Sequence, residues 1–277
     1  MTVELGRFGI WQGGQNLSPE LAAGVEKLGF GTVWIGSSPS GDLRLAERLL
    51  EATTRIAVGT SIVNVWKDAP ELVAESYHRV EERFPGRFML GIGIGHPEQS
   101  AAYTSPYNKL VEYLDALDAA GVPAGRRALA ALGPKVLRLA AERSAGALPY
   151  LVTPEHTRRA REILGPDALL APEHKVVVDA DPERGRELGR ARVSKPYLGL
   201  VNYVNNLRKL GYTDEDVAGS GSDRLIDDLA LHGAPDVIAK GLAAHFDAGA
   251  DHVVVQVLKG PGDDLLAKHA ELAEALF

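Results

Sequence analysis

The chain contains no cysteine among its 277 residues, which excludes disulfide bonds and thiolate chemistry. No apolar run reaches the ~20 residues that a membrane-spanning helix needs, so no membrane association is expected. The N-terminus has no basic segment followed by an apolar run, the pattern of a signal peptide, and the sequence therefore predicts a soluble, cytoplasmic protein. A formal net charge of −7 argues against a nucleic-acid-binding surface.

Motifs for metal binding and for nucleophilic catalysis are also missing. The histidines are scattered, and no pair has the helical spacing, with a third ligand, of a zinc site. No G-x-S-x-G segment supports a serine nucleophile. The run GIGIGH ends at His96 and is followed by Pro97 and Glu98, so it is not the dinucleotide fingerprint, which opens a helix. These absences favour a bound organic cofactor as the source of reactivity.

Short apolar runs alternate with amphipathic helical segments over most of the chain. Several predicted helices have a proline at their first position, as at Pro19, Pro70 and Pro134. About eight such strand–helix units, with strands that are continuously apolar, predict a parallel (β/α)8 TIM barrel. A doubly wound open sheet is the main alternative. We expect a single domain over residues 1–277, with a helical insertion between Ala191 and His232, before the last βα unit.

Polar residues and glycines gather where the predicted strands end, which is where barrels place their working groups. In the stretch RIAVGTSIVNVW, a buried strand is interrupted by Gly59 and two hydroxyl residues before Asn64. Glycines at these ends either relieve crowding at the rim or let a flat ligand lie against the backbone. The strand-end candidates are Gln12–Gly14, Gly36–Ser38, Thr60, Ser61, Asn64, Gly93–His96, Leu132–Pro134 and Gln256.

Five segments, taken in order, resemble the bacterial luciferase-like superfamily and, within it, the actinobacterial oxidoreductases that depend on coenzyme F420, a deazaflavin. They are VWIG after EKLGFGT, VGTSIVN, PGRFMLGIGIGH, LGPKVLRLAAERSAGALPYLVTPEH and HFDAGADHVVVQVL. The resemblance extends from near Phe8 to near Leu258. It implies the same barrel fold that the strand count predicts.

The resemblance also implies roles for individual residues. It places a non-prolyl cis peptide bond at Ser61-Ile62, in a bulge that backs the deazaflavin ring, and a cofactor contact at Asn64. It assigns further cofactor contacts to Ile94, Gly95, Gln99, Leu132 and Gly133. His96 stands where relatives carry a group near the reacting carbon, so we expect it to transfer a proton.

One departure limits what the resemblance implies. A well-studied branch carries an Asp-His pair after the second strand, where this chain has Ser37-Ser38. The sequence therefore predicts hydride transfer between F420 and an unidentified small organic substrate. Three alternatives stay open: an FMN-dependent monooxygenase, a deazaflavin-binding protein without turnover, and an unrelated barrel lyase or isomerase acting on a phosphorylated metabolite. The apolar helices leave room for a homodimer.

Overall fold

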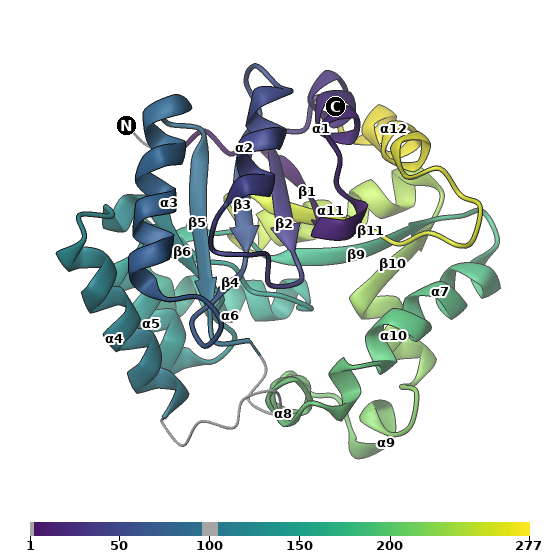
Figure 1. Cartoon of the computed structure of the whole chain (residues 1–277). Coiled ribbons are helices and arrows are strands. Elements are labelled where there is room, and N and C mark those ends of the chain that lie inside the picture. Colours follow the sequence, from purple (N-terminus) through teal and green to yellow (C-terminus); the bar gives the residue numbers. More distant parts are fainter. Residues whose placement is uncertain (1–2, 96–104) are drawn as a thin grey trace.

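A parallel β-sheet curls into a barrel, and helices surround it (Figure 1). The computed structural model describes residues 3–95 and 105–277. Most strands are followed by a helix that returns the chain to the other end of the sheet, as parallel pairing requires. The predicted (β/α)8 barrel is confirmed. None of the helices in these two ranges is long and apolar enough to cross a membrane.

The strands and helices have the following bounds. The strands are β1 (Phe8–Gly13), β2 (Thr32–Gly36), β3 (Ala57–Ser61), β4 (Val63–Asn64), β5 (Phe88–Gly93), β6 (Arg127–Leu129), β7 (Gly146–Ala147), β8 (Leu169–Leu170), β9 (Glu173–Val178), β10 (Ala230–Gly233) and β11 (Val253–Val257). The helices are α1 (Pro19–Lys27), α2 (Arg44–Glu51), α3 (Pro70–Arg83), α4 (Pro106–Ala119), α5 (Pro134–Arg143), α6 (Pro154–Leu164), α7 (Pro182–Ser194), α8 (Val201–Lys209), α9 (Asp214–Val217), α10 (Asp223–Leu229), α11 (Pro235–Asp247) and α12 (Leu265–Leu276).

The segment formed by β8 and β9 closes the ring of strands. β8 pairs with β7, and β9 pairs with β11, which in turn pairs with β1. Between the two ladders, Ala171 N donates to Ala147 O at 3.0 Å and Val254 N donates to Pro172 O at 2.9 Å. The short strand β10 adds to the far half of β9. The eight strand positions around the barrel are therefore β1, β2, β3–β4, β5, β6, β7, β8–β9 and β11.

Apolar side chains form two layers, one inside the barrel and one between the barrel and its helices. Inside, Trp34 is fully buried among small or flexible residues such as Ala57 and Met89. Space for this ring comes from Gly59, where an added Cβ would lie 2.4 Å from Trp34 Cζ3. The larger layer outside the barrel is made of aliphatic residues from the strands and the inward faces of the helices.

The chain between β9 and β10 carries the helices α8, α9 and α10 beyond helix α7, in agreement with the predicted helical insertion. We call residues 195–229 the insertion. In Figure 1 these helices lie below the barrel, beyond the ends to which the strand arrows point. The insertion packs on a second apolar core, which includes Leu207, Leu225 and Ile226.

Several strands are shorter than their apolar runs: β6 ends at Leu129 and β7 at Ala147.

The strand β3–β4 contains one residue more than its partner β5. Gly59 lies opposite Met89 and Val63 opposite Ile92, so four steps on one strand match three on the other. This is a β-bulge, and the peptide bond Ser61-Ile62 within it is cis. Both features that the family resemblance implied are confirmed.

A threonine side chain replaces the ladder hydrogen bonds that the bulge interrupts. Thr60 Oγ1 donates to Gly91 O at 2.8 Å and accepts from Gly91 N at 2.9 Å. Thr60 is 1% exposed, so water cannot take over these bonds. An added Cβ at Gly91 would lie 1.8 Å from Thr60 O, which shows how closely the two strands approach.

We expect Thr60→Val, which keeps the side-chain shape, to lower the free energy of unfolding by about 2 kcal/mol, because it leaves a buried donor and acceptor of Gly91 unpaired. Urea denaturation followed by circular dichroism measures this loss. The control is Thr54→Val, at an exposed position, for which we expect less than about 0.5 kcal/mol. Equal losses in the two variants would contradict the role given to Thr60.

Several buried histidines are neutral in the folded protein, and His252 joins parts of the barrel. His252 Nδ1 donates to Gly6 O at 2.8 Å, and its Nε2 accepts from Trp34 Nε1 at 3.0 Å. Burial lowers the pKa of His252 and that of His269 to about 4 each, and that of His245 to about 3. A second proton on His252 Nε2 would face the indole N–H of Trp34. These contacts give His252 a structural role.

These pKa values predict an acid-sensitive fold. Unfolded histidines have a pKa near 6.5, so above that pH neither state is charged and the lowered values have no effect. Below pH 6.5 these histidines bind protons in the unfolded chain but not in the folded chain. Stability is therefore lost from about pH 6.5 down to about pH 4. Each such histidine lowers the free energy of unfolding by about 1.4 kcal/mol at pH 5.5.

Urea denaturation at pH 7.5 and pH 5.5 measures this loss. In His252→Gln, the difference between the two pH values should shrink by about 1.4 kcal/mol, whatever the variant's absolute stability. His78→Gln changes an exposed histidine and should leave the difference as it is. A pH difference that His252→Gln does not alter would show that His252 is not among its sources.

Candidate active site

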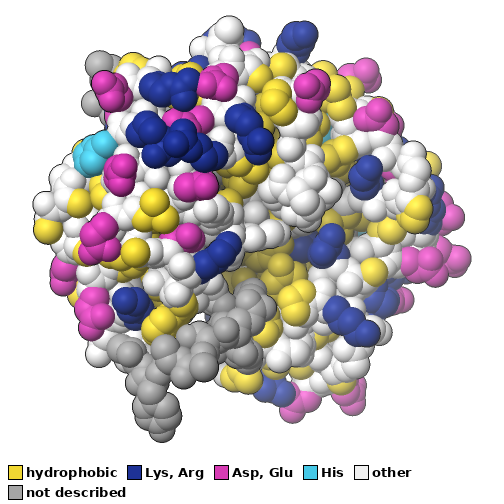
Figure 2. All heavy atoms as spheres, viewed as in Figure 1, with side chains coloured by type: hydrophobic (Ala, Val, Ile, Leu, Met, Phe, Trp, Pro, Cys, Tyr) yellow, Lys and Arg dark blue, Asp and Glu magenta, His cyan; other side chains and the backbone are white. Residues whose placement is uncertain are grey.

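A cavity of about 340 Å³ opens at the carboxyl ends of the strands, between the barrel and the insertion. Figure 2 shows hydrophobic side chains in this hollow, beside the residues drawn in grey. None of the described lining residues carries a charge. They are Trp11, Ser37, Ser38, Ser61, Ile62, Asn64, Ile94, Gly95, Ala130, Ala131, Leu132, Gly133, Val136, Leu148, Tyr150, Tyr197, Asn202 and Tyr203.

The lining divides into two sides that come from opposite arcs of the barrel. The ends of β2, β3–β4, β5 and β6 supply, in this order, Ser37 and Ser38, then Ser61, Ile62 and Asn64, then residues 94–95, and then residues 130–133. We call this the backbone side, because small residues and main chain dominate it. The opposite arc and the insertion supply three tyrosines and a tryptophan, and we call this the aromatic side.

Asn64 and Gly95 lie together on the backbone side. Asn64 Oδ1 accepts from Trp66 N at 3.0 Å, which orients the amide group. The nitrogen Nδ2 then faces Gly95, where an added Cβ would lie only 2.5 Å away. Gly95 has φ of +60°, a conformation that favours glycine. This arrangement leaves the amide nitrogen of Asn64 at the cavity as a hydrogen-bond donor.

The loop after β6 brings the N-terminus of α5 to the cavity. Gly133 is the N-cap of α5, and no side chain caps this end. A Cβ added at Gly133 would meet nothing within 4 Å, so the cavity reaches the backbone there. His156 Nε2 donates to Leu132 O at 2.8 Å and fixes the loop from behind. Pro134 has no N–H and Val136 N donates to Gly133 O at 3.2 Å, so the positive end of the helix dipole and the N–H of Lys135 are what would favour an anion here.

On the aromatic side, rings lie against one another in a continuous row. The ring centroids of Trp11 and Tyr150 are 5.4 Å apart, those of Tyr150 and Tyr197 are 5.4 Å apart, and those of Tyr197 and Tyr203 are 5.1 Å apart. Tyr197 donates its hydroxyl to that of Tyr150 at 3.0 Å, and Tyr150 donates to Gln256 Oε1 at 2.9 Å. Burial raises the pKa of Tyr197 to about 12, so these hydroxyls stay protonated at neutral pH.

A buried ion pair supports the aromatic side from within the barrel. Lys175 Nζ lies 3.0 and 3.2 Å from the two carboxylate oxygens of Glu173 and 3.9 Å from the ring centroid of Tyr150. Glu173 also accepts from Leu151 N at 2.9 Å. The Lys175 side chain is fully buried, and that burial lowers the pKa of its ammonium group.

Most of the site residues predicted from the sequence do meet at this cavity. Ser61, Ile62, Asn64, Ile94, Gly95, Leu132 and Gly133 all line it. The predicted catalytic His96 and the predicted cofactor contact Gln99 lie outside the described residues. Their assigned roles therefore remain predictions.

Other strand-end candidates have structural partners instead. Gln12 donates to Val257 O at 3.0 Å and joins β1 to β11. Thr60 bonds to Gly91, as described above, and Gln256 supports Tyr150. Trp66, just beyond the end of β4, is not among the residues that line this cavity. Within the described part of the chain, no three histidine, aspartate or glutamate side chains are grouped to hold a metal ion.

The whole aromatic side was missed in the sequence analysis. Tyr150 stands just after a strand, in the run ALPYLV, and could have been found as a strand-end residue. Lys175 interrupts the apolar run of a buried strand, which is itself a signal. Tyr197, Asn202 and Tyr203 come from the insertion, and no local pattern indicates where its helices fold back over the barrel.

The cavity at the carboxyl ends of the barrel strands is therefore the candidate active site. Residues 16–121 match the model of the luciferase-like monooxygenase family. This match covers part of the chain, and it agrees with the resemblance to the luciferase-like superfamily found in the sequence. No curated protein matches the sequence.

Solved structures share the fold over nearly the whole chain. An F420-dependent secondary alcohol dehydrogenase in complex with an F420–acetone adduct has a TM-score of 0.75 at 14% identity, with 100% of both chains covered. A coenzyme F420-dependent tetrahydromethanopterin reductase from Methanopyrus kandleri has a TM-score of 0.69 at 16% identity, covering 98% of this chain and 97% of that one.

A flavin enzyme is equally similar. The oxygenating constituent of 3,6-diketocamphane monooxygenase from Pseudomonas putida, in complex with FMN, has a TM-score of 0.70 at 14% identity, covering 98% of this chain and 95% of that one. At these identities the similarity concerns the fold. The neighbours named here include both F420-dependent enzymes and an FMN complex.

Proposed function

We propose that the protein is an oxidoreductase that transfers a hydride between coenzyme F420 and a small, uncharged organic substrate. The observation that carries this proposal is the two-sided cavity: a backbone side that ends at an uncapped helix N-terminus, facing an aromatic side. The described lining offers no nucleophile-and-base pair and no charged side chain. Such a site suits a cofactor that brings its own reactivity.

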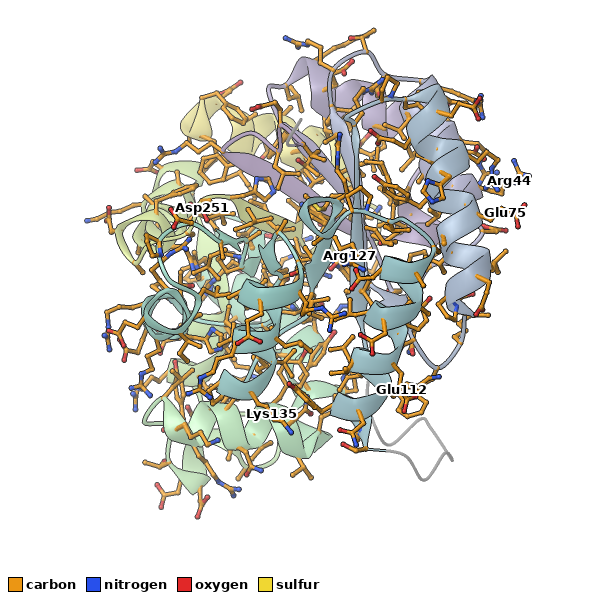
Figure 3. All side chains as sticks on the ribbon, turned by 90° about the vertical axis from the view of Figure 1, so that its left-hand side faces the viewer. Arg44, Glu75, Glu112, Arg127, Lys135 and Asp251 are labelled. Atoms are coloured by element: carbon orange, nitrogen blue, oxygen red, sulfur yellow. The ribbon has the colours of Figure 1, made fainter. Side chains whose placement is uncertain are left out.

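The residues of the backbone side fit a deazaflavin. Residues 61–62 and Ala130 would support its ring system, and Asn64 Nδ2 would donate a hydrogen bond to it. The open space at Gly133 would admit its anionic tail, whose phosphate would bind at the N-terminus of α5. Figure 3 shows Lys135 at this end of α5, where its ammonium group lies 3.7 Å from the ring centroid of Tyr107.

When bound, a deazaflavin accepts or supplies a hydride. The chain's own contribution is to hold the two reactants in contact and to exclude water between them. Ser37 and Ser38 provide hydroxyls at the cavity where the related branch carries its Asp-His pair. We assign proton transfer to His96 or to solvent, as the sequence predicts.

A second candidate function is an FMN-dependent monooxygenase, because the matching family model is that of luciferase-like monooxygenases and one neighbour of the same fold binds FMN. Titrating the purified protein with F420 and with FMN, followed by cofactor fluorescence, distinguishes the two. We expect F420 to bind at least tenfold more tightly. Tighter binding of FMN would overturn the proposal in favour of the monooxygenase. Binding of F420 without turnover of any substrate panel would favour a binding protein.

The role of Asn64 is tested by two substitutions. Asn64→Asp keeps the oxygen that accepts from Trp66 N but removes the amide donor, so we expect F420 to bind about fivefold to tenfold more weakly at unchanged stability. Asn64→Leu also removes the hydrogen bond that Asn64 Oδ1 accepts from Trp66 N, and it should weaken F420 binding at least as much. Fluorescence titration measures both affinities, and unchanged values would exclude Asn64 from the cofactor site.

Gly133→Val tests the cavity wall without disturbing the fold. The backbone there, with φ of −96° and ψ of 161°, accepts any residue, and the new side chain would enter open space. We therefore expect an unchanged melting temperature and at least tenfold weaker F420 binding. Gly125→Val is the matched control, since a Cβ at Gly125 also meets nothing within 4 Å but lies outside the cavity. Full affinity in Gly133→Val would rule out this position for the cofactor.

A further inference from the structure

The aromatic side of the cavity is held rigidly in place. Tyr150 is fixed by its hydroxyl bond to Gln256, by the Tyr197 hydroxyl and by Lys175 against its ring. Tyr203 packs edge-on against Tyr197 at an interplanar angle of 69° and is itself part of the second apolar core, under the insertion. Contacts within the protein therefore hold the rings in their tilted and edge-on arrangement along the cavity.

This surface presents no net charge to the cavity. The Lys175 ammonium group lies behind Tyr150 and is neutralised by Glu173, whose carboxylate also accepts from Leu151 N. A charged ligand would lose its hydration here without finding a counter-charge among the described lining residues, which is costly. Aromatic rings in tilted and edge-on arrangements attract further rings. The hydroxyls of Tyr150 and Tyr197 and the amide of Asn202 add polar contacts at the same surface.

The aromatic side also lies across the cavity from the proposed cofactor wall. In the order of strands around the barrel, β3–β4, β5 and β6 occupy one arc, whereas β7, β9, β11 and β1 occupy the other. Tyr150 follows β7, Gln256 lies on β11 and Trp11 on β1. A ligand on the aromatic side would therefore face a cofactor on the backbone side.

We propose that Trp11, Tyr150, Tyr197 and Tyr203 form the substrate subsite, and that it takes an uncharged, ring-containing compound with a hydroxyl or carbonyl group. This inference rests on the proposed function for its reaction, in which the substrate's reacting carbon is held between the tyrosines and the cofactor. The insertion, which supplies Tyr197, Asn202 and Tyr203, is then the element that determines specificity.

Isothermal titration calorimetry with three probes tests the subsite, with and without F420. The probes are 2-naphthol, which is uncharged at pH 7.5, 2-naphthoate, which has the same rings and a negative charge, and 1-octanol, which has a hydroxyl and no ring. We expect 2-naphthol to bind at least tenfold more tightly than either of the others. Equal binding of 2-naphthoate or of 1-octanol would overturn the proposed substrate class.

Variants locate the bound probe. Tyr197→Leu and Tyr203→Leu should each weaken 2-naphthol binding about fivefold, whereas Tyr203→Phe, which keeps the ring, should retain it. Gly133→Val, on the backbone side, should leave 2-naphthol binding unchanged, and the leucine variants should bind F420 normally. Should a leucine variant fail to fold, the Gly133→Val result still decides, because lost 2-naphthol binding there would put the probe on the wrong side.

The two proposals fail in different ways. Selective 2-naphthol binding at the tyrosines in a protein that does not bind F420 would overturn the proposed reaction and leave the aromatic subsite standing. Loss of F420 binding in Gly133→Val, together with unchanged 2-naphthol binding in Tyr197→Leu and Tyr203→Leu, would overturn the subsite alone.

Discussion

The pairing of a bulged strand with its neighbour is the constraint on which the cavity depends. Thr60 accepts from and donates to the backbone of Gly91, so β3–β4 stays joined to β5 although the two strands are out of step by one residue. Without the extra residue, side chains beyond Thr60 would alternate as in a regular strand. With it, Ser61, Ile62 and Asn64 line the cavity while Val63 remains fully buried in the core.

Elsewhere too, buried polar groups form hydrogen bonds that fix the residues lining the cavity. His156 holds the carbonyl of Leu132, Gln256 holds Tyr150, and the pair of Lys175 and Glu173 holds both Tyr150 and the backbone at Leu151. Each of these groups is buried and hydrogen-bonded, as groups in a low-dielectric interior must be. The cavity itself can therefore stay uncharged while its walls are positioned by charged and polar contacts.

The barrel and the backbone side could be predicted from the sequence because their signals are local. Continuous apolar runs, helix-starting prolines and polar strand ends repeat along the chain, and parallel strands bring their carboxyl ends together. Asn64, Gly95 and Gly133 were found in this way or through the family resemblance. The aromatic side depends on contacts such as Tyr150 with Tyr197, 47 residues apart, and on the placing of the fully buried Lys175 against the ring of Tyr150. Strand lengths also escaped prediction, since the runs around β6 and β7 continue as irregular chain.

The insertion is stabilised by the second apolar core, which is separate from the main apolar layer of the barrel. Leu207, Leu225 and Ile226 pack among themselves and against α7 rather than into the barrel's main layer. Residues 195–229 could therefore be exchanged for another set of helices that present the same apolar surface to this core. The strand ends and the N-terminus of α5 would then stay as they are. Such an architecture allows one barrel to keep its chemistry while the compounds it accepts diverge, because the two requirements are met by different cores.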